Sequence, residues 1–189
     1  MKKEIDIVEE VRKFVENESQ KSSARYGHDF YTFHLIPMYN YAKKLSEEKK
    51  ADTKTVELAA LLHDIGAIIY GRENHHITGA RVAEDKLREL GCSEEQIERV
   101  KNCIVNHRGS VNLEKKIIEE QIIADADAIS TFDNIPGIFK AAFVYEKQHQ
   151  IQAKESAKQK LENCWKKLSL KESKKLIRPK YEAAMLLLT

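Results

Sequence analysis

The sequence of 189 residues predicts a soluble, all-α fold of about eight or nine helices. Apolar residues recur every three or four positions along nearly the whole chain, which is the spacing of an amphipathic helix. No run alternates apolar and polar residues as a strand does, and no Asn-Gly hairpin signal occurs. Residue types that start and end helices flank most of these periodic segments.

The N-terminal half contains four predicted helices, over residues 5–19, 30–45, 53–65 and 75–90. Asp52 or Thr53 can cap the third helix, because their side-chain oxygens accept from free backbone N–H groups. Gly66 is expected to end the third helix and Gly91 the fourth, since glycine is favoured just after a helix.

The C-terminal half contains five more predicted helices, over residues 97–107, 113–129, 136–148, 151–168 and from 169 onward. Ser-Glu-Glu-Gln at 93–96 and Ser-Leu-Lys-Glu at 169–172 match the capping box that opens a helix. Asn112 can cap the helix that follows it. The lysine-rich segment from Lys158 to Lys180 is interpreted as the solvated face of two surface helices.

Composition restricts the class of protein. Charged residues make up 33% of the chain with a net charge of only +2, so no nucleic-acid polymer is expected as a partner. No stretch approaches the roughly 18 apolar residues that span a bilayer, and the charged N-terminus does not resemble a signal peptide. The three cysteines show no Cys-x-x-Cys spacing and are expected as free thiols, which favours a cytoplasmic protein.

Residues 58–69, Leu-Ala-Ala-Leu-Leu-His-Asp-Ile-Gly-Ala-Ile-Ile, place His63 and Asp64 inside an apolar stretch. An unpaired carboxylate there would cost several kcal/mol unless it were paired or bound a metal. On a helix the two side chains would point about 100° apart, yet both can reach an ion over the edge between them. The alternative is a hydrogen-bonded core histidine beside a helix-capping aspartate.

Four further segments offer an imidazole or a carboxylate within or beside an apolar stretch. They are His34, Asn-His-His-Ile-Thr-Gly-Ala at 74–80, Cys-Ile-Val-Asn-His-Arg-Gly at 103–109 and Ile-Ile-Ala-Asp-Ala-Asp-Ala-Ile-Ser at 122–130. This mixture of nitrogen and oxygen ligands suits Mn, Fe, Co, Ni or Zn, whereas calcium prefers more oxygens. Together they favour a metal site over an isolated structural pair.

These residues resemble the HD-domain superfamily of metal-dependent phosphohydrolases, in which a His, a His-Asp pair and a distant Asp bind one divalent metal. The resemblance covers residues 28–145 and implies the ligands His34, His63, Asp64 and Asp127. Asp125 lies about 200° from Asp127 on a helix, so it is interpreted as a supporting or capping carboxylate. The whole chain, 1–189, is expected to form a single HD domain, with helices of 146–189 packing on the core.

The resemblance also implies roles for three additional histidines. Gly79 follows His75 by four residues, which favours His75 over His76, and the next helix supplies His107. In relatives with two metals, Asp64 would bridge the ions and two histidines would hold the second. In relatives with one metal, the same histidines contact substrate phosphate. The expected cofactor is therefore one divalent transition metal, with a second ion as an option.

The activity implied is hydrolysis of a phosphoester in a nucleotide or another small phosphorylated metabolite. Asp64, His75 and His107 are the candidate catalytic residues, and Arg72 and Arg108 the candidate phosphate contacts.

Departures from the family pattern keep other interpretations open. Ala67 stands where a lysine is common, and Ala128 and Ser130 replace a charged pair. A metal-containing sensor or binding module of weak activity is one alternative, and a di-iron oxygenase of the same fold is another. A homodimer is compatible with each of these interpretations.

Overall fold

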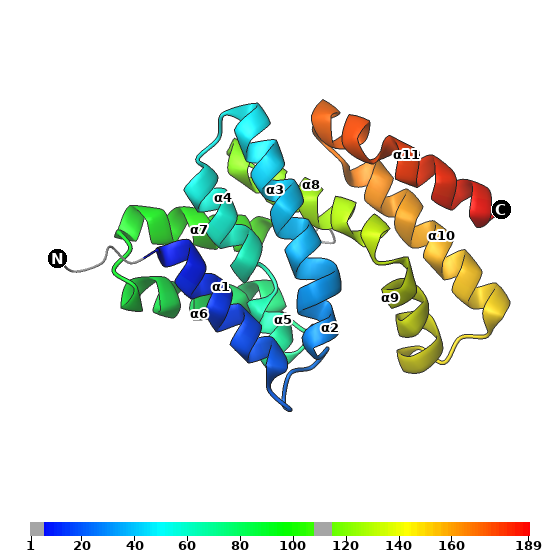
Figure 1. The fold of residues 1–189 in the computed structure, drawn as a ribbon, viewed down its shortest axis with the longest axis horizontal. Helices are drawn as coiled ribbons and strands as arrows, with labels where there is room; N and C mark the ends of the chain where they lie inside the picture. Colours follow the sequence, from blue (N-terminus) through cyan, green and yellow to red (C-terminus); the bar gives the residue numbers. More distant parts are fainter. Residues whose placement is uncertain (1–5, 108–114) are drawn as a thin grey trace.

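The structure, a computed structural model, describes residues 6–107 and 115–189 (Figure 1). The described residues form helices and no strand, which confirms the predicted all-α class. The helices are α1 (Ile7–Gln20), α2 (His28–Phe30), α3 (Ile36–Lys49), α4 (Thr53–Leu62), α5 (Ile65–Tyr70), α6 (His75–Glu89), α7 (Glu94–Asn106), α8 (Ile118–Ser130), α9 (Ile135–Lys140), α10 (Gln150–Lys167) and α11 (Lys171–Leu187). Two π-helical turns, η1 (Tyr31–Leu35) and η3 (Ala141–Tyr145), and a 3₁₀ turn, η2 (Thr131–Asp133), continue them.

The core lies between α3, α4 and α8, and the remaining helices cover this central group. Helix α4 is buried along most of its length, because α1, α3 and α7 all pack against it. Helix α6 packs against α5 and α7. Helices α10 and α11 run side by side and pack against α8 (Figure 1). Side chains of α11 also bond to α3, where Glu172 pairs with Lys49 and Lys180 donates to the Tyr41 hydroxyl.

Several predicted caps are present. Asp52 accepts a hydrogen bond from the Thr55 backbone N–H and begins α4. Ser93 accepts from the Gln96 backbone N–H and begins α7. The Gln96 side chain donates to the Thr55 hydroxyl instead of returning to Ser93, so half of the predicted capping box forms. This hydrogen bond links the start of α7 to the start of α4 at one edge of the core.

The prediction that Gly66 ends a helix is wrong. The helix ends earlier, at Leu62, and Gly66 lies inside α5. A Cβ on Gly66 would lie 2.3 Å from the His75 carbonyl oxygen and 2.6 Å from the Gly79 nitrogen. This glycine is required by the close approach of α5 and α6, a tertiary contact that no local signal reveals.

Two other helix starts differ from the prediction. Helix α8 begins at Ile118, later than the predicted residue 113, and Asn112 lies outside the described residues. The Ser-Leu-Lys-Glu capping box does not form, because Leu170 is the N-cap of α11. The backbone N–H and hydroxyl of Ser169 donate instead to the Asp125 carboxylate on α8. A buried tertiary partner replaces the local one.

The three cysteines are free thiols, as predicted. Among the described residues, no helix is both long and apolar enough to cross a bilayer.

Candidate metal centre

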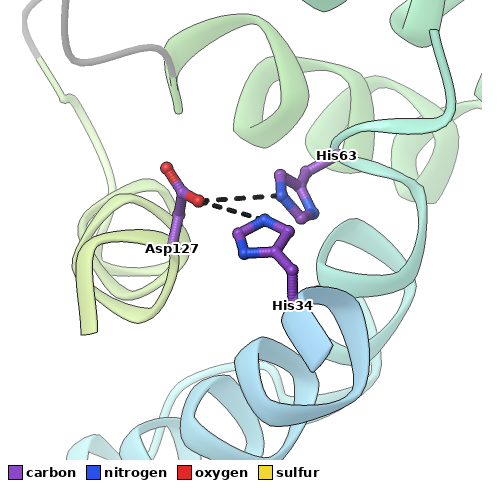
Figure 2. Close-up of side chains that lie close together, drawn as sticks. All are labelled: His34, His63 and Asp127. Carbon is purple, nitrogen blue, oxygen red and sulfur yellow. Dashed lines mark ion pairs between the residues drawn. The ribbon is translucent and has the colours of Figure 1, made fainter. Parts of the chain in front are cut away.

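Five separate parts of the chain bring histidines and aspartates to one centre. His34 lies on η1, His63 and Asp64 at the junction of α4 and α5, and Asp127 on α8. His75 begins α6 and His107 follows α7, which completes the centre from the other side. Figure 2 shows His34 and His63, from two different elements, both pointing toward Asp127 on the facing helix.

In the first group, the Nε2 atoms of His34 and His63 lie close to one oxygen of Asp127 and one oxygen of Asp64. Nε2 of His34 lies 3.4 Å from Asp127 Oδ1, and Nε2 of His63 lies 3.9 Å from the same oxygen (Figure 2). Asp64 Oδ2 lies 3.6 Å from His34 Nε2 and 3.3 Å from His63 Nε2. The side-chain atoms of His34, His63 and Asp127 are close enough to hold one ion.

The second group uses the other oxygen of Asp64. Asp64 Oδ1 lies 3.2 Å from His75 Nε2 and 3.7 Å from His107 Nε2. The two Nε2 atoms are 3.3 Å apart, and the three residues can also hold an ion. Asp64 therefore faces both groups, one oxygen to each.

In these histidines Nδ1, the ring nitrogen that points away from the aspartates, has a hydrogen-bond partner. That partner determines whether Nε2 carries a proton. Nδ1 of His63 donates to the Ala60 carbonyl, that of His75 to Arg72 and that of His107 to Ile104. Such outer hydrogen bonds place the proton on Nδ1, so Nε2 presents a lone pair to the centre. A histidine set held this way is suited to bind a cation.

His63 supplies a direct test of whether the residues fit a metal. Its side chain is fully buried, and its Nε2 has no hydrogen-bond partner. A buried polar atom without a partner costs about 1–3 kcal/mol. The Nε2 atoms of His75 and His107 also face each other, which is unfavourable for two lone pairs. A cation between these atoms and the carboxylates removes both penalties, so the residues fit a metal.

The charges of the centre are arranged around Asp64. Burial opposes its ionisation, but the surrounding histidines, His63 foremost, hold the pKa of Asp64 well below its usual range. Burial likewise opposes a charge on His63, yet the Asp64 carboxylate prevails and raises the pKa of His63. For His75 burial prevails and lowers the pKa, which keeps the imidazole neutral near pH 7. The site pairs an ionised carboxylate with at least one neutral imidazole.

Two candidate ligands, His34 and Asp64, are oriented by local departures from a regular α-helix. His34 lies in the π turn η1, just before Pro37, which has no N–H to continue a regular helix. The chain also breaks between α4 and α5, where Asp64 has φ −111° and ψ 13° and its carbonyl starts the next helix. The prediction that His63 and Asp64 lie on one continuous helix is therefore wrong. The break turns Asp64 toward both groups.

The remaining predicted residues lie in different surroundings. His76 is buried beside His75, with ring centroids 5.8 Å apart, but belongs to neither ligand group. The Arg72 side chain is exposed, and its carbonyl holds His75. Arg108 lies outside the described residues. Asp125 points away from the centre and caps α11, in agreement with its predicted separation from Asp127.

Two neighbours of His34 were not predicted. Ser130 lies 3.1 Å from His34 Nδ1, and the Phe30 ring lies 4.7 Å from the imidazole between centroids. In the sequence Ser130 stands out only as a departure from the family pattern. Its contact joins residues 96 positions apart, so only the folded chain reveals it.

Comparison with known proteins finds relatives that match part of this chain. Ribonuclease Y of Borreliella burgdorferi is 39% identical over 90 residues, which are 46% of this chain and 16% of the ribonuclease. Ribonuclease Y of Borreliella afzelii matches to the same extent. This chain spans about one sixth of the length of these relatives.

Two solved structures share the fold. The crystal structure of an HD-superfamily hydrolase from Bacillus thuringiensis has a TM-score of 0.74 at 23% identity, covering 96% of this chain and 92% of that one. Bacillus subtilis YpgQ, solved in complex with ADP, has a TM-score of 0.71 at 21% identity, covering 95% and 92%. At these identities the likeness concerns the fold.

The family model described as HD domain matches residues 31–131, a span that contains both ligand groups. Since that match covers more than half of the 189 residues, the chain belongs to the HD-domain family.

Proposed function

We propose that the chain is a metal-dependent phosphohydrolase that acts on a nucleotide or another small phosphorylated metabolite. The observation that carries this proposal is the pair of ligand groups, each faced by one oxygen of Asp64, together with the buried His63 Nε2 that has no hydrogen-bond partner. Histidine and carboxylate ligands of this kind suit Mn, Fe, Co, Ni or Zn.

His34, His63, Asp64 and Asp127 would hold one divalent ion. Such an ion supplies Lewis-acid polarisation of a phosphoryl oxygen and lowers the pKa of a water. Asp64, kept ionised by its histidine neighbours, would act as a ligand and orient that water. Asp127 is the more exposed carboxylate, with 34% of its side chain accessible, so substrate would approach beside it.

His75 and His107 have two candidate roles, as ligands of a second ion or as contacts to substrate phosphate. The neutral state of His75 favours the ligand role, because a neutral imidazole can bind a metal but cannot neutralise phosphate. Asp64, with one oxygen facing each group, would then help to hold both ions. Arg72, whose side chain is exposed beside this group, is the candidate for holding the phosphate.

A nucleotide is favoured as the substrate because YpgQ, with the same fold, was solved with ADP. The identity to ribonuclease Y favours RNA phosphodiesters as a second candidate. A panel containing nucleoside mono-, di- and triphosphates, sugar phosphates and a short RNA oligonucleotide separates the two.

The test reconstitutes the purified chain with Mn²⁺, Co²⁺ or Ni²⁺ and follows bound metal and phosphate release together. Asp64→Ala should lose metal at both groups and lower turnover about a hundredfold or more, since a direct ligand outweighs its supporting residues. Asp85→Ala, at an exposed aspartate on α6, should leave both unchanged.

Three other outcomes would contradict the proposal. Unchanged metal content in Asp64→Ala would exclude this metal site. Metal without turnover across the panel would favour a sensor or binding module. Two irons with dioxygen consumption and no phosphate release would favour an oxygenase.

A further inference from the structure

We propose that Ser130 is the positioning residue of His34 and thereby determines the affinity of the first ligand group for its metal. This inference rests on the proposed metal site and deepens it. It concerns a residue that stands out in the sequence only as a departure from the family pattern.

The Ser130 hydroxyl connects two ligands of the same group. Ser130 is fully buried, and its hydroxyl donates to the Asp127 carbonyl oxygen at 2.8 Å. The hydroxyl oxygen is therefore left to accept from Nδ1–H of His34, 3.1 Å away. This bond directs His34 Nε2 toward the Asp127 and Asp64 carboxylates.

His34 needs a side-chain partner because its backbone position differs from that of the other three histidines. His63 and His107 follow the ends of α4 and α7, and each uses the carbonyl three residues earlier. Those carbonyls belong to last turns, where intrahelical donors are missing. The Arg72 carbonyl that holds His75 lies outside a helix, in the loop before α6.

His34 lies inside a continuous helical segment. The carbonyl three residues before it, that of Tyr31, already accepts the Ile36 N–H in the π turn. Nδ1 of His34 therefore has a partner from another helix, and Ser130 on α8 supplies it. Removing the hydroxyl affects this histidine and leaves the supports of the other three in place.

The experiment measures the affinity of Mn²⁺ by calorimetry for the full chain and its variants. Ser130→Ala should weaken binding at one site about ten- to a hundredfold, the range for partners that orient a ligand. Ser130→Cys fills the same space with a poor acceptor and should behave as Ser130→Ala does. Ser130→Thr keeps the hydroxyl and should recover much of the affinity.

Thr131→Ala is the matched control. Its hydroxyl donates to the same Asp127 carbonyl, at 3.4 Å, whereas the partner of His34 Nδ1 is Ser130, so the affinity should stay at the wild-type value. In a His34→Ala background, Ser130→Ala should cause no further loss, because the two residues act through one another. Thermal unfolding of the metal-free variants shows that each is folded.

Three results would overturn the role of Ser130. They are wild-type Mn²⁺ affinity in Ser130→Ala, an equal loss of affinity at both sites, and a full further loss of affinity when Ser130→Ala is added to His34→Ala. Metal binding by the wild type without phosphate release would contradict the proposed function and leave this inference intact. Absence of metal binding by the wild type would overturn both.

Discussion

At the residue scale, the centre depends on which nitrogen of each histidine carries the proton. Four imidazoles have Nδ1 engaged, three with a backbone carbonyl and one with Ser130. All four therefore present Nε2 to the aspartates. The shared orientation is stronger support for a metal than the presence of histidines alone, because a structural histidine satisfies both nitrogens within the protein.

Metal affinity should depend on pH through His63. A metal binds the neutral imidazole, so a proton competes with it, and Asp64 raises the pKa of His63 above 6.5. Affinity for Mn²⁺ should hence fall as the pH drops through this raised pKa, by about tenfold for each pH unit below it for one competing proton. Calorimetry from pH 8 to pH 5.5 checks this. His149→Asn, at an exposed histidine, should keep the same profile, and a flat profile for the wild type would contradict the prediction.

Gly66→Ala should destabilise the protein by about 3 kcal/mol, since the new Cβ meets backbone atoms of α6 that cannot rotate away. It should also weaken metal binding, because the displaced α6 carries His75. Urea unfolding and calorimetry measure the two effects. Gly91→Ala is the control: it meets nothing within 4 Å and costs only the strain of φ +78°, about 1 kcal/mol. Equal costs for the two variants would refute the close approach as the cause.

At the scale of elements, α8 serves two sides of the molecule with two aspartates. Asp127 faces the ligand groups, whereas Asp125 accepts from Ser169 and Leu170 and caps α11. A carboxylate at a helix start also complements the helix dipole. The same helix thus carries a proposed metal ligand and anchors the C-terminal pair α10 and α11.

Asp125→Asn and Asp127→Asn should therefore separate stability from binding. Asp125→Asn places an amide donor against backbone donors in a buried site and should cost about 2 kcal/mol of unfolding free energy. Asp127→Asn should change the stability of the metal-free protein by less than about 1 kcal/mol and lower the metal affinity. Chemical unfolding and metal titration test this contrast, and the reverse assignment of effects would contradict it.

At the scale of the whole molecule, the ligands come from η1, the junction of α4 and α5, the start of α6, the end of α7 and α8. Ions held by the two groups would join elements that otherwise meet through side-chain packing and a few hydrogen bonds such as Ser130–His34. Because the unfolded chain cannot assemble these ligands, metal binding should stabilise the folded state.

Mn²⁺ at about a hundred times its dissociation constant should add about 2.7 kcal/mol of stability. For a protein of this size that raises Tm by about 5–10 °C. Thermal unfolding in excess Mn²⁺ and in EDTA measures the shift, which should vanish in Asp64→Ala because Asp64 faces both ligand groups. An identical Tm in both conditions would argue against a metal that bridges these elements.

The all-α class and most helix positions follow from the sequence because helical periodicity and caps such as Asp52 and Ser93 are local properties. The ligand set follows as a hypothesis from residue types and their resemblance to a family. The start of α8, the interior position of Gly66 and the failed capping box at 169–172 do not follow, since tertiary contacts override the local preference there.

The sequence by itself therefore determined the helical class and the family, and it predicted a ligand set that stays a hypothesis. Only the tertiary structure decided that Asp64 faces two groups, that Asp125 caps a distant helix and that Ser130 supports His34. The physical reason is that hydrogen bonds between residues 44 and 96 positions apart depend on how helices pack, and no period within one helix encodes them.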